Sequence, residues 1–453
     1  MKVFSAIRKK ISNVHPDHHA IVRGMAWVAL FVFVGKLAGA AKEMAIAYRY
    51  GVSNEVDAYL FILNIVGVPV SVWFSILTYV LIPLAVRLRH ENSGDLPRFR
   101  AELLAFTLVL GCDLALLFWF GLPVLLHSSW LGLSPSTVTI AVNMVPSMIT
   151  LVPLGLLTSL FSAWMLSSGR HANTLLESVP AMAILAAVLV LPYKGTEPLV
   201  WGTLAGFTLH TLTLASPLLR AGEIEMPKFT SRSPQWPNFW LGFGIMLIGS
   251  GLGSFNSIID QFFAAQLGTG AIATISYANR VVALILGLGA TAISRATLPV
   301  FSKIKSQQGD QLQRIAMTWV RLMFLIGIMT MLISWKLAPW VIKLLFERGA
   351  FTASDTQVVT EVFRYGLAQV PFYFPSLALV TLLASHGKHK LIAISGATNL
   401  FVKASANFVL VPLLGINAII LSSGIMYLVS LCLLYWFGSR LLKKEDAKSD
   451  ETI

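Results

Sequence analysis

The sequence predicts an all-α polytopic membrane protein of about twelve transmembrane helices, arranged as two six-helix bundles around a central cleft. Of its 453 residues, 56% are hydrophobic and 12% are charged, whereas soluble proteins carry roughly 25% charged residues. Apolar runs of about twenty residues, each long enough to cross a bilayer core, recur from Gly24 to Phe437. The two halves of the chain also resemble one another, and this repeat predicts the two bundles.

The apolar runs predict helices rather than the strands of a membrane barrel, because alternating segments of roughly ten residues do not dominate. The predicted helices span 24–50, 56–86, 101–126, 138–167, 173–192, 198–219, 237–265, 272–301, 315–346, 356–384, 391–411 and 417–439. The connections on one side and both termini carry nearly all of the loop lysines and arginines, and the other side carries Lys194 and Arg348. This bias predicts that both termini are cytoplasmic.

The predicted helices divide the chain into five parts. These are a cytoplasmic amphipathic segment at 1–23, an N-terminal bundle at 24–219, a cytoplasmic linker at 220–236, a C-terminal bundle at 237–439 and a charged cytoplasmic tail at 440–453. The formal net charge of +13 fits this topology, whereas a nucleic-acid partner would require a basic face on an aqueous domain that the chain does not predict.

The repeat keeps a nearly constant offset along the chain. Gly51 corresponds to Gly268, and the Ser-Gly-Arg-His segment at 168–171 corresponds to the His-Gly-Lys-His segment at 386–389. Six predicted helices separate the copies, so the two bundles insert with the same orientation. Two such bundles enclose a cleft that rocking exposes to each side in turn, which favours a transporter.

Charges at bilayer depth are costly and therefore require partners or a water-filled cavity. Helix one carries Lys36, Lys42 and Glu43 in mid-span, and Arg280 and Asp260 lie in later helices. One interpretation pairs Lys36 with Glu43 and Arg280 with Asp260 as structural ion pairs. The other, which the excess of cations favours, has Lys36, Lys42 and Arg280 bind the pyrophosphate of an anionic substrate, since ammonium and guanidinium groups form charge-assisted hydrogen bonds to phosphate.

The segment at 345–356, which contains Glu347, Arg348 and Gly349 in a predicted external loop, resembles the MurJ (MviN) family. Members of this family are lipid II flippases of the multidrug/oligosaccharidyl-lipid/polysaccharide exporter superfamily. The segment at 277–280 is similar to the family motif in helix eight, whose arginine is implicated in binding the lipid pyrophosphate. The segment at 35–43 resembles the arginine-bearing stretch of family helix one.

Asp57 resembles an acidic family position at the start of helix two, so it joins Glu43 and Asp260 as an expected charge partner. The resemblance covers nearly the whole chain. It implies a flippase, not an enzyme, that moves an undecaprenyl-pyrophosphate-linked saccharide from the cytoplasmic to the periplasmic leaflet of the bacterial inner membrane by alternating access. The implied partners are that glycan, membrane lipids and glycan-assembly proteins, without cofactor, metal or nucleic acid.

The sequence departs from the family at three positions of helix one. Lys36 and Lys42 stand where lipid II flippases usually carry arginine, and Glu43 stands for aspartate. These departures leave lipid II and an exopolysaccharide repeat unit both open as cargo and slightly favour the exopolysaccharide unit.

Two other functions fit the sequence less well than a flippase. A cation-coupled multidrug exporter of the MATE type should line its site with acids, whereas cations predominate here. A membrane-embedded glycan polymerase or ligase commonly carries a large external loop with catalytic residues, and the predicted external loops are short. Nucleophile motifs and glycine-rich phosphate loops are also lacking, which argues against covalent catalysis.

Overall fold

The computed structural model describes residues 16–450 except 92–93, 171–172, 193–194 and 305–308, so most of the predicted amphipathic segment at 1–23 lies outside it. The described residues form helices and contain no strand, which confirms the all-α prediction. The helices are α2 (Pro16–Tyr50), α3 (Asn54–Ile76), η1 (Leu77–Leu81), α4 (Ile82–His90), α5 (Asp95–Leu126), η2 (Ser129–Leu131), α6 (Pro135–Met148), α7 (Leu151–Ser167), α8 (Asn173–Leu176), α9 (Val179–Val190), α10 (Glu197–Arg220), α11 (Trp236–Ala265), α12 (Ala271–Ile304), α13 (Gly309–Phe346), α14 (Ala353–Gly366), η3 (Leu367–Gln369), α15 (Val370–Ser385), α16 (His389–Leu414) and α17 (Ile416–Asp450).

Each of the twelve predicted segments coincides with one of these helices or with consecutive ones. Within the described ranges, eight helices are long and apolar enough to cross a membrane, and α6 with α7 forms a further candidate bent by 49°. The predicted helix at 138–167 is broken there because Pro153 has no N–H to donate to the carbonyl of Ile149. Pro153 therefore accounts for the bend between α6 and α7.

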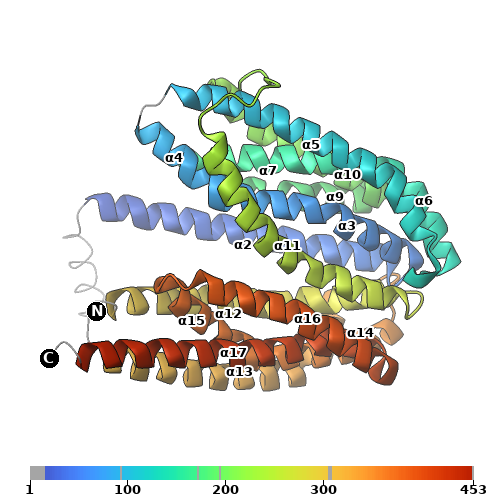
Figure 1. Cartoon of the computed structure of the whole chain (residues 1–453). Helices are drawn as coiled ribbons and strands as arrows, with labels where there is room; N and C mark the ends of the chain where they lie inside the picture. The colour runs from blue at the N-terminus through green and yellow to red at the C-terminus, as the bar shows by residue number, and fades with distance from the viewer. Residues whose placement is uncertain (1–15, 92–93, 171–172, 193–194, 305–308, 451–453) are drawn as a thin grey trace, which may run out of the picture.

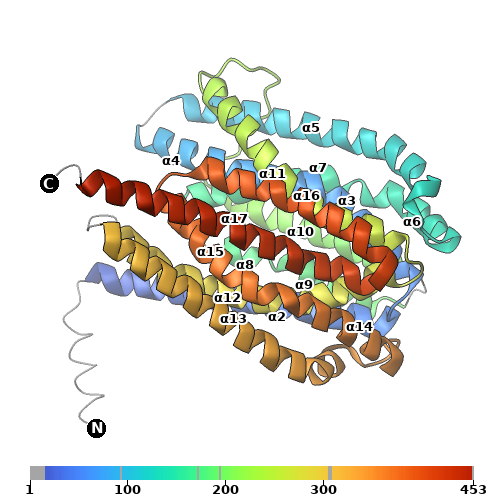
Figure 2. The ribbon, with the colours of Figure 1, turned by 60° about the horizontal axis from the view of Figure 1, so that its bottom comes forward.

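The helices form two groups that follow the order of the sequence. In Figure 1, α2 to α10 make up the upper group, α12 to α17 make up the lower group, and α11 crosses between them. The start of α2 and the end of α17 lie at the same end of the molecule. Figure 2 shows α16 and α17 side by side in the second group, where they are in extensive contact.

Backbone geometry supports the internal repeat. Gly169 and Gly387 occupy corresponding positions after α7 and α15, and both have a φ of 70°. In each copy the following residue donates its N–H to the carbonyl five residues earlier, from Arg170 to Met165 and from Lys388 to Leu383. Both helices thus end in the same Schellman motif, in which glycine takes the left-handed conformation.

The connection between α10 and α11 is tied to the first group of helices. Glu223 pairs with Arg89 at 2.6 Å, with Arg100 at 2.8 Å and with Arg170 at 3.3 Å. Burial opposes ionisation of Glu223, but hydrogen bonds from Arg89 and Ser168 together with the arginine charges outweigh it and lower the pKa of Glu223 below its usual 4.5. The predicted linker at 220–236 is therefore anchored by charge rather than loose.

Helix α11 begins on the first group and ends on the second. The ring of Trp236 lies 5.5 Å from that of Phe99, and its indole N–H donates to Glu102 at 2.7 Å. Near the other end of α11, Asp260 pairs with Lys403 of α16. The helix therefore connects the two groups physically as well as in sequence.

Candidate functional site

A cluster of charges lies where α2 meets α12. Glu43 accepts from Lys42 of the same helix at 2.8 Å and from Arg280 of α12 at 3.1 Å. Glu43 is buried, with 6% of its surface exposed, whereas the Arg280 side chain is 48% exposed. One carboxylate of the first group thus holds a lysine and an arginine of two different helices at the same place.

One of the two interpretations of the sequence paired Lys36 with Glu43, and the structure does not show this pair. Within the described residues, Lys36 forms no ion pair, and Glu43 is occupied by Lys42 and Arg280 instead. Residues seven apart do share a helix face, and Lys36 and Glu43 line the same cavity. Lys36 and Glu43 therefore share a helix face as expected, but the partners of Glu43 are the adjacent Lys42 and Arg280 of α12.

This cavity, which we call the cationic chamber, has a volume of about 230 Å³. Its charged lining residues are Lys36, Lys42, Glu43 and Arg280, so three cations face one carboxylate. The Lys36 ammonium reaches across to α12, where it lies 3.7 Å from the position that a methyl group on Gly287 would take. The chamber therefore carries two positive charges in excess, contributed by both groups of helices.

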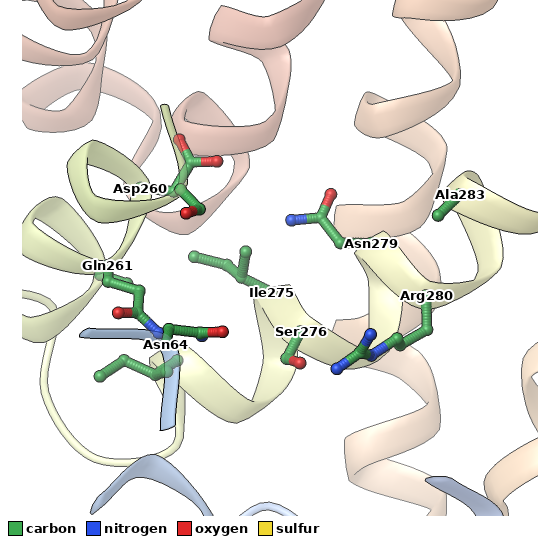
Figure 3. A pocket seen from close by; sticks show the side chains of 11 residues that line it. Asn64, Asp260, Gln261, Ile275, Ser276, Asn279, Arg280 and Ala283 are labelled. Atoms are coloured by element: carbon green, nitrogen blue, oxygen red, sulfur yellow. The ribbon is translucent and has the colours of Figure 1, made fainter. Parts of the chain in front are cut away.

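A second cavity of about 260 Å³ adjoins the chamber, because Arg280 and Ala283 line both. Figure 3 shows it between α11, which carries Asp260 and Gln261, and α12, which carries Ser276, Asn279 and Arg280. Gln261 donates to the backbone carbonyl of Leu60 in α3 at 3.1 Å. Polar side chains thus continue the space from the cationic chamber towards α11.

One interpretation of the sequence paired Asp260 with Arg280, but the structure pairs Asp260 with another residue. Its carboxylate accepts from Lys403 of α16 at 2.8 Å, and the same ammonium donates to the Ser423 hydroxyl of α17 at 2.9 Å. Lys403 and Asp260 are both buried, at 4% and 8% exposed. The sequence carries no signal for this pair, because nothing in the periodicity relates α11 to α16.

We expect Lys403→Met to lower the stability of the protein by about 3–5 kcal/mol, because it leaves the Asp260 carboxylate buried without a counter-charge. Thermal unfolding in detergent measures this. The double variant Asp260→Asn with Lys403→Met should recover more than half of the loss, since no charge then remains buried. Lys388→Met, at an exposed lysine, is the control. A double variant as unstable as Lys403→Met would contradict this account.

Asp57 also has a different role from the expected one. Within the described chain it pairs with no side-chain cation, and its two carboxylate oxygens accept from the backbone N–H groups of Gly270 and Ala273 at 2.5 and 2.7 Å. These amides lie at the start of α12, where unpaired N–H groups and the helix dipole favour an anion. Asp57 therefore caps α12 from the first group of helices.

The loop motif at 347–349 lies at the same end of the molecule as Asp57. Glu347 pairs with Lys343 at 3.4 Å, and Arg348 donates to the carbonyl of Leu344 at 2.8 Å, so both act within the end of α13. Gly349 has a φ of +61° and lies directly against the Tyr48 carbonyl. There the N–H of Ala350 donates to that carbonyl at 2.7 Å.

These contacts interlock the two groups of helices at the end opposite the start of α2. The Tyr277 hydroxyl adds a hydrogen bond to the Gly51 carbonyl at 3.0 Å. The hydrogen bonds from Gly270, Ala273, Tyr277 and Ala350 to the first group all lie at this end, whereas the Glu43–Arg280 pair joins the two groups at the cationic chamber. We call this set of contacts the distal seal.

The arrangement has few groups suited to covalent or metal chemistry. Among the described residues, no three histidine, cysteine or carboxylate side chains gather closely enough to hold a metal ion. Cys112 and Cys432 are free and exposed. What the site offers is an excess of fixed positive charge beside a polar cavity.

Comparison with known proteins identifies the family. The family described as "Lipid II flippase MurJ" matches residues 25–450. The Lipid II flippase MurJ of Burkholderia cenocepacia is 23% identical over 427 residues, which cover 89% of this chain and 81% of that protein. The Probable lipid II flippase MurJ of Helicobacter pylori strain J99 is 33% identical over 192 residues, and that match spans 41% of each protein.

The solved structures give the same fold. A structure described as lipid II flippase MurJ in an inward closed conformation superimposes with a TM-score of 0.80 at 17% identity, covering 94% of this chain and 90% of that one. An inward-facing multidrug resistance MATE family transporter of the MOP superfamily gives 0.73 at 14% identity, covering 92% and 96%. The curated relatives are named as flippases, in keeping with the prediction of a transporter rather than an enzyme. This chain is a multi-pass membrane protein and belongs to the MurJ lipid II flippase family.

Proposed function

We propose that this protein flips an undecaprenyl-pyrophosphate-linked saccharide from the cytoplasmic to the periplasmic leaflet of the bacterial inner membrane. The observation that carries the proposal is the cationic chamber, in which Lys36, Lys42 and Arg280 outnumber Glu43. A diphosphate drawn into the membrane loses hydration, and charge-assisted hydrogen bonds to these cations compensate for that loss. Because both groups of helices supply the cations, relative movement of the groups changes the site.

Alternating access is supported by the one-sided distribution of contacts between the two groups. The distal seal joins the two groups at the end opposite the start of α2, and the distribution of lysine and arginine predicts that this end is periplasmic. Rocking of two like-oriented bundles about a fixed site moves the opening from one side to the other. We therefore infer that cargo enters this conformation from the cytoplasmic side.

The chamber recognises a diphosphate, which every undecaprenyl-pyrophosphate-linked glycan shares. Lysine binds phosphate as a point charge, so the lysines at 36 and 42 suit a lipid II precursor and an exopolysaccharide repeat unit alike. The names of the relatives make lipid II the first cargo to test. A cationic drug, by contrast, would be repelled by the excess of positive charge.

The test reconstitutes the purified protein into liposomes with fluorescent lipid II and measures the rate at which the label in the inner leaflet becomes accessible to an impermeant quencher. We expect this rate to exceed that of protein-free liposomes at least tenfold. A parallel assay measures proton-driven or sodium-driven ethidium export. Ethidium export without lipid II movement would favour a drug exporter and overturn the proposal.

A further inference from the structure

We propose that a cavity inside the first group of helices binds the sugar that follows the pyrophosphate of the cargo. This inference rests on the proposed function. The cavity, which we call the sugar chamber, has a volume of about 530 Å³, within the range of roughly 300–1,000 Å³ that is typical of small-ligand sites. It lies among α2, α3, α7, α9 and α10 and contains no residue of the second group.

The sugar chamber adjoins the cationic chamber through one residue. Lys42 lines both cavities, and its ammonium is held beside Glu43 at 2.8 Å. A diphosphate bound in the cationic chamber therefore has Lys42 next to it, with the sugar chamber on the other side of that lysine. The first sugar of a lipid-linked glycan is covalently joined to the diphosphate, so it must lie within reach of the same residue.

Two polar groups of the sugar chamber lack partners among the described residues. His210 is only 7% exposed, and its Nε2 atom is buried and forms no hydrogen bond with the described residues. The hydroxyl of Ser162, a residue 4% exposed, likewise has no hydrogen bond there. Buried polar groups are normally satisfied, so an unpaired imidazole nitrogen in a cavity wall is available to accept a hydrogen bond from a ligand. A sugar hydroxyl can donate to the nitrogen and bond the serine.

The remaining walls suit a sugar ring better than a second phosphate. Phe74 and Phe207 give the chamber aromatic surface, against which the C–H face of a pyranose can pack. Glu177 adds a carboxyl group, which accepts hydrogen bonds from hydroxyls and repels phosphate when ionised. The negatively charged diphosphate therefore binds beside Lys42 in the cationic chamber, and the neutral, hydroxyl-rich sugar binds in the sugar chamber.

The test compares two ligands that differ in the glycan. Affinities of the purified full-length protein for lipid II and for undecaprenyl pyrophosphate, which has no sugar, are measured in the same detergent. We expect the unmodified protein to bind lipid II more tightly. Ser162→Ala and His210→Phe should each weaken lipid II binding about three- to tenfold, the effect of one hydrogen bond, and leave undecaprenyl pyrophosphate binding unchanged.

The control is Ser167→Ala, on the same helix as Ser162. Ser167 is buried too, but its hydroxyl donates to the Trp164 carbonyl and does not line the chamber. We expect this variant to change neither affinity. Ser162→Ala removes a single atom and so keeps the test valid if His210→Phe does not fold.

The outcomes separate this inference from the proposed function. Equal affinity of the unmodified protein for the two ligands, or equal losses for both in Ser162→Ala, would overturn the sugar chamber and leave the flippase intact. Failure of the unmodified protein to bind either ligand would overturn the flippase, and the sugar chamber with it.

Discussion

Replacing Lys36 or Arg280 with alanine is expected to abolish lipid II movement in liposomes while the protein still inserts and folds. The two side chains provide charge to the cationic chamber from opposite groups of helices. A hydrogen bond to a charged group is worth about 1.5–3 kcal/mol, so each loss should weaken binding of undecaprenyl pyrophosphate by about 10- to 150-fold. Binding measurements check the loss of affinity, and quencher-accessibility measurements on the same variants check the loss of lipid II movement.

The structure explains why folding should survive these changes. Lys36 has no carboxylate partner in the described chain, so its removal strands no acid. Removal of Arg280 leaves Glu43 with Lys42. Lys36→Arg, which keeps the charge, should retain activity, and Lys336→Ala changes an exposed lysine of α13 outside the chamber as a control. Full transport by both Lys36→Ala and Arg280→Ala would remove the basis for the cationic chamber as the binding site.

Gly349→Ala is expected to open the distal seal. Glycine is required there for two reasons, since φ is +61° and a methyl group would overlap the Tyr48 carbonyl oxygen. Relief of that overlap must separate the loop from α2 and break the hydrogen bond from Ala350 to Tyr48. An overlap costing about 1–3 kcal/mol shifts a conformational equilibrium by about 5- to 150-fold, here towards the state open at the distal end.

Labelling from the periplasmic side measures this shift. In a background with Cys112→Ser and Cys432→Ser, Ala283→Cys places a thiol on the wall of the chamber, and an impermeant maleimide reports its access. We expect Gly349→Ala to raise the labelling rate at least fivefold. Gly387→Ala is the matched control, because its φ is +70° but the added methyl group meets open space. Equal labelling in the two variants would show that the seal does not depend on this contact.

Much of the fold could be predicted from the sequence because a bilayer imposes simple requirements. The runs at 56–86 and 417–439 are apolar for long enough to leave helix as the only way to satisfy the backbone, and the structure places helices there. The repeat was visible because glycines such as Gly169 and Gly387 have conformations that other residues adopt at a cost. The break before α7 was missed because proline is common inside membrane helices.

The sequence by itself determined which charges enter the membrane, namely Lys36, Lys42, Glu43, Arg280 and others, since charge at that depth must have a use or a partner. Only the tertiary structure decided which charged residues pair with each other. Asp260 pairs with Lys403 and Asp57 caps α12, because partners come from helices far apart in the chain. A helix that is apolar on all sides gives no periodic signal of which face meets which neighbour, so its rotation and its contacts are settled only when the helices pack together.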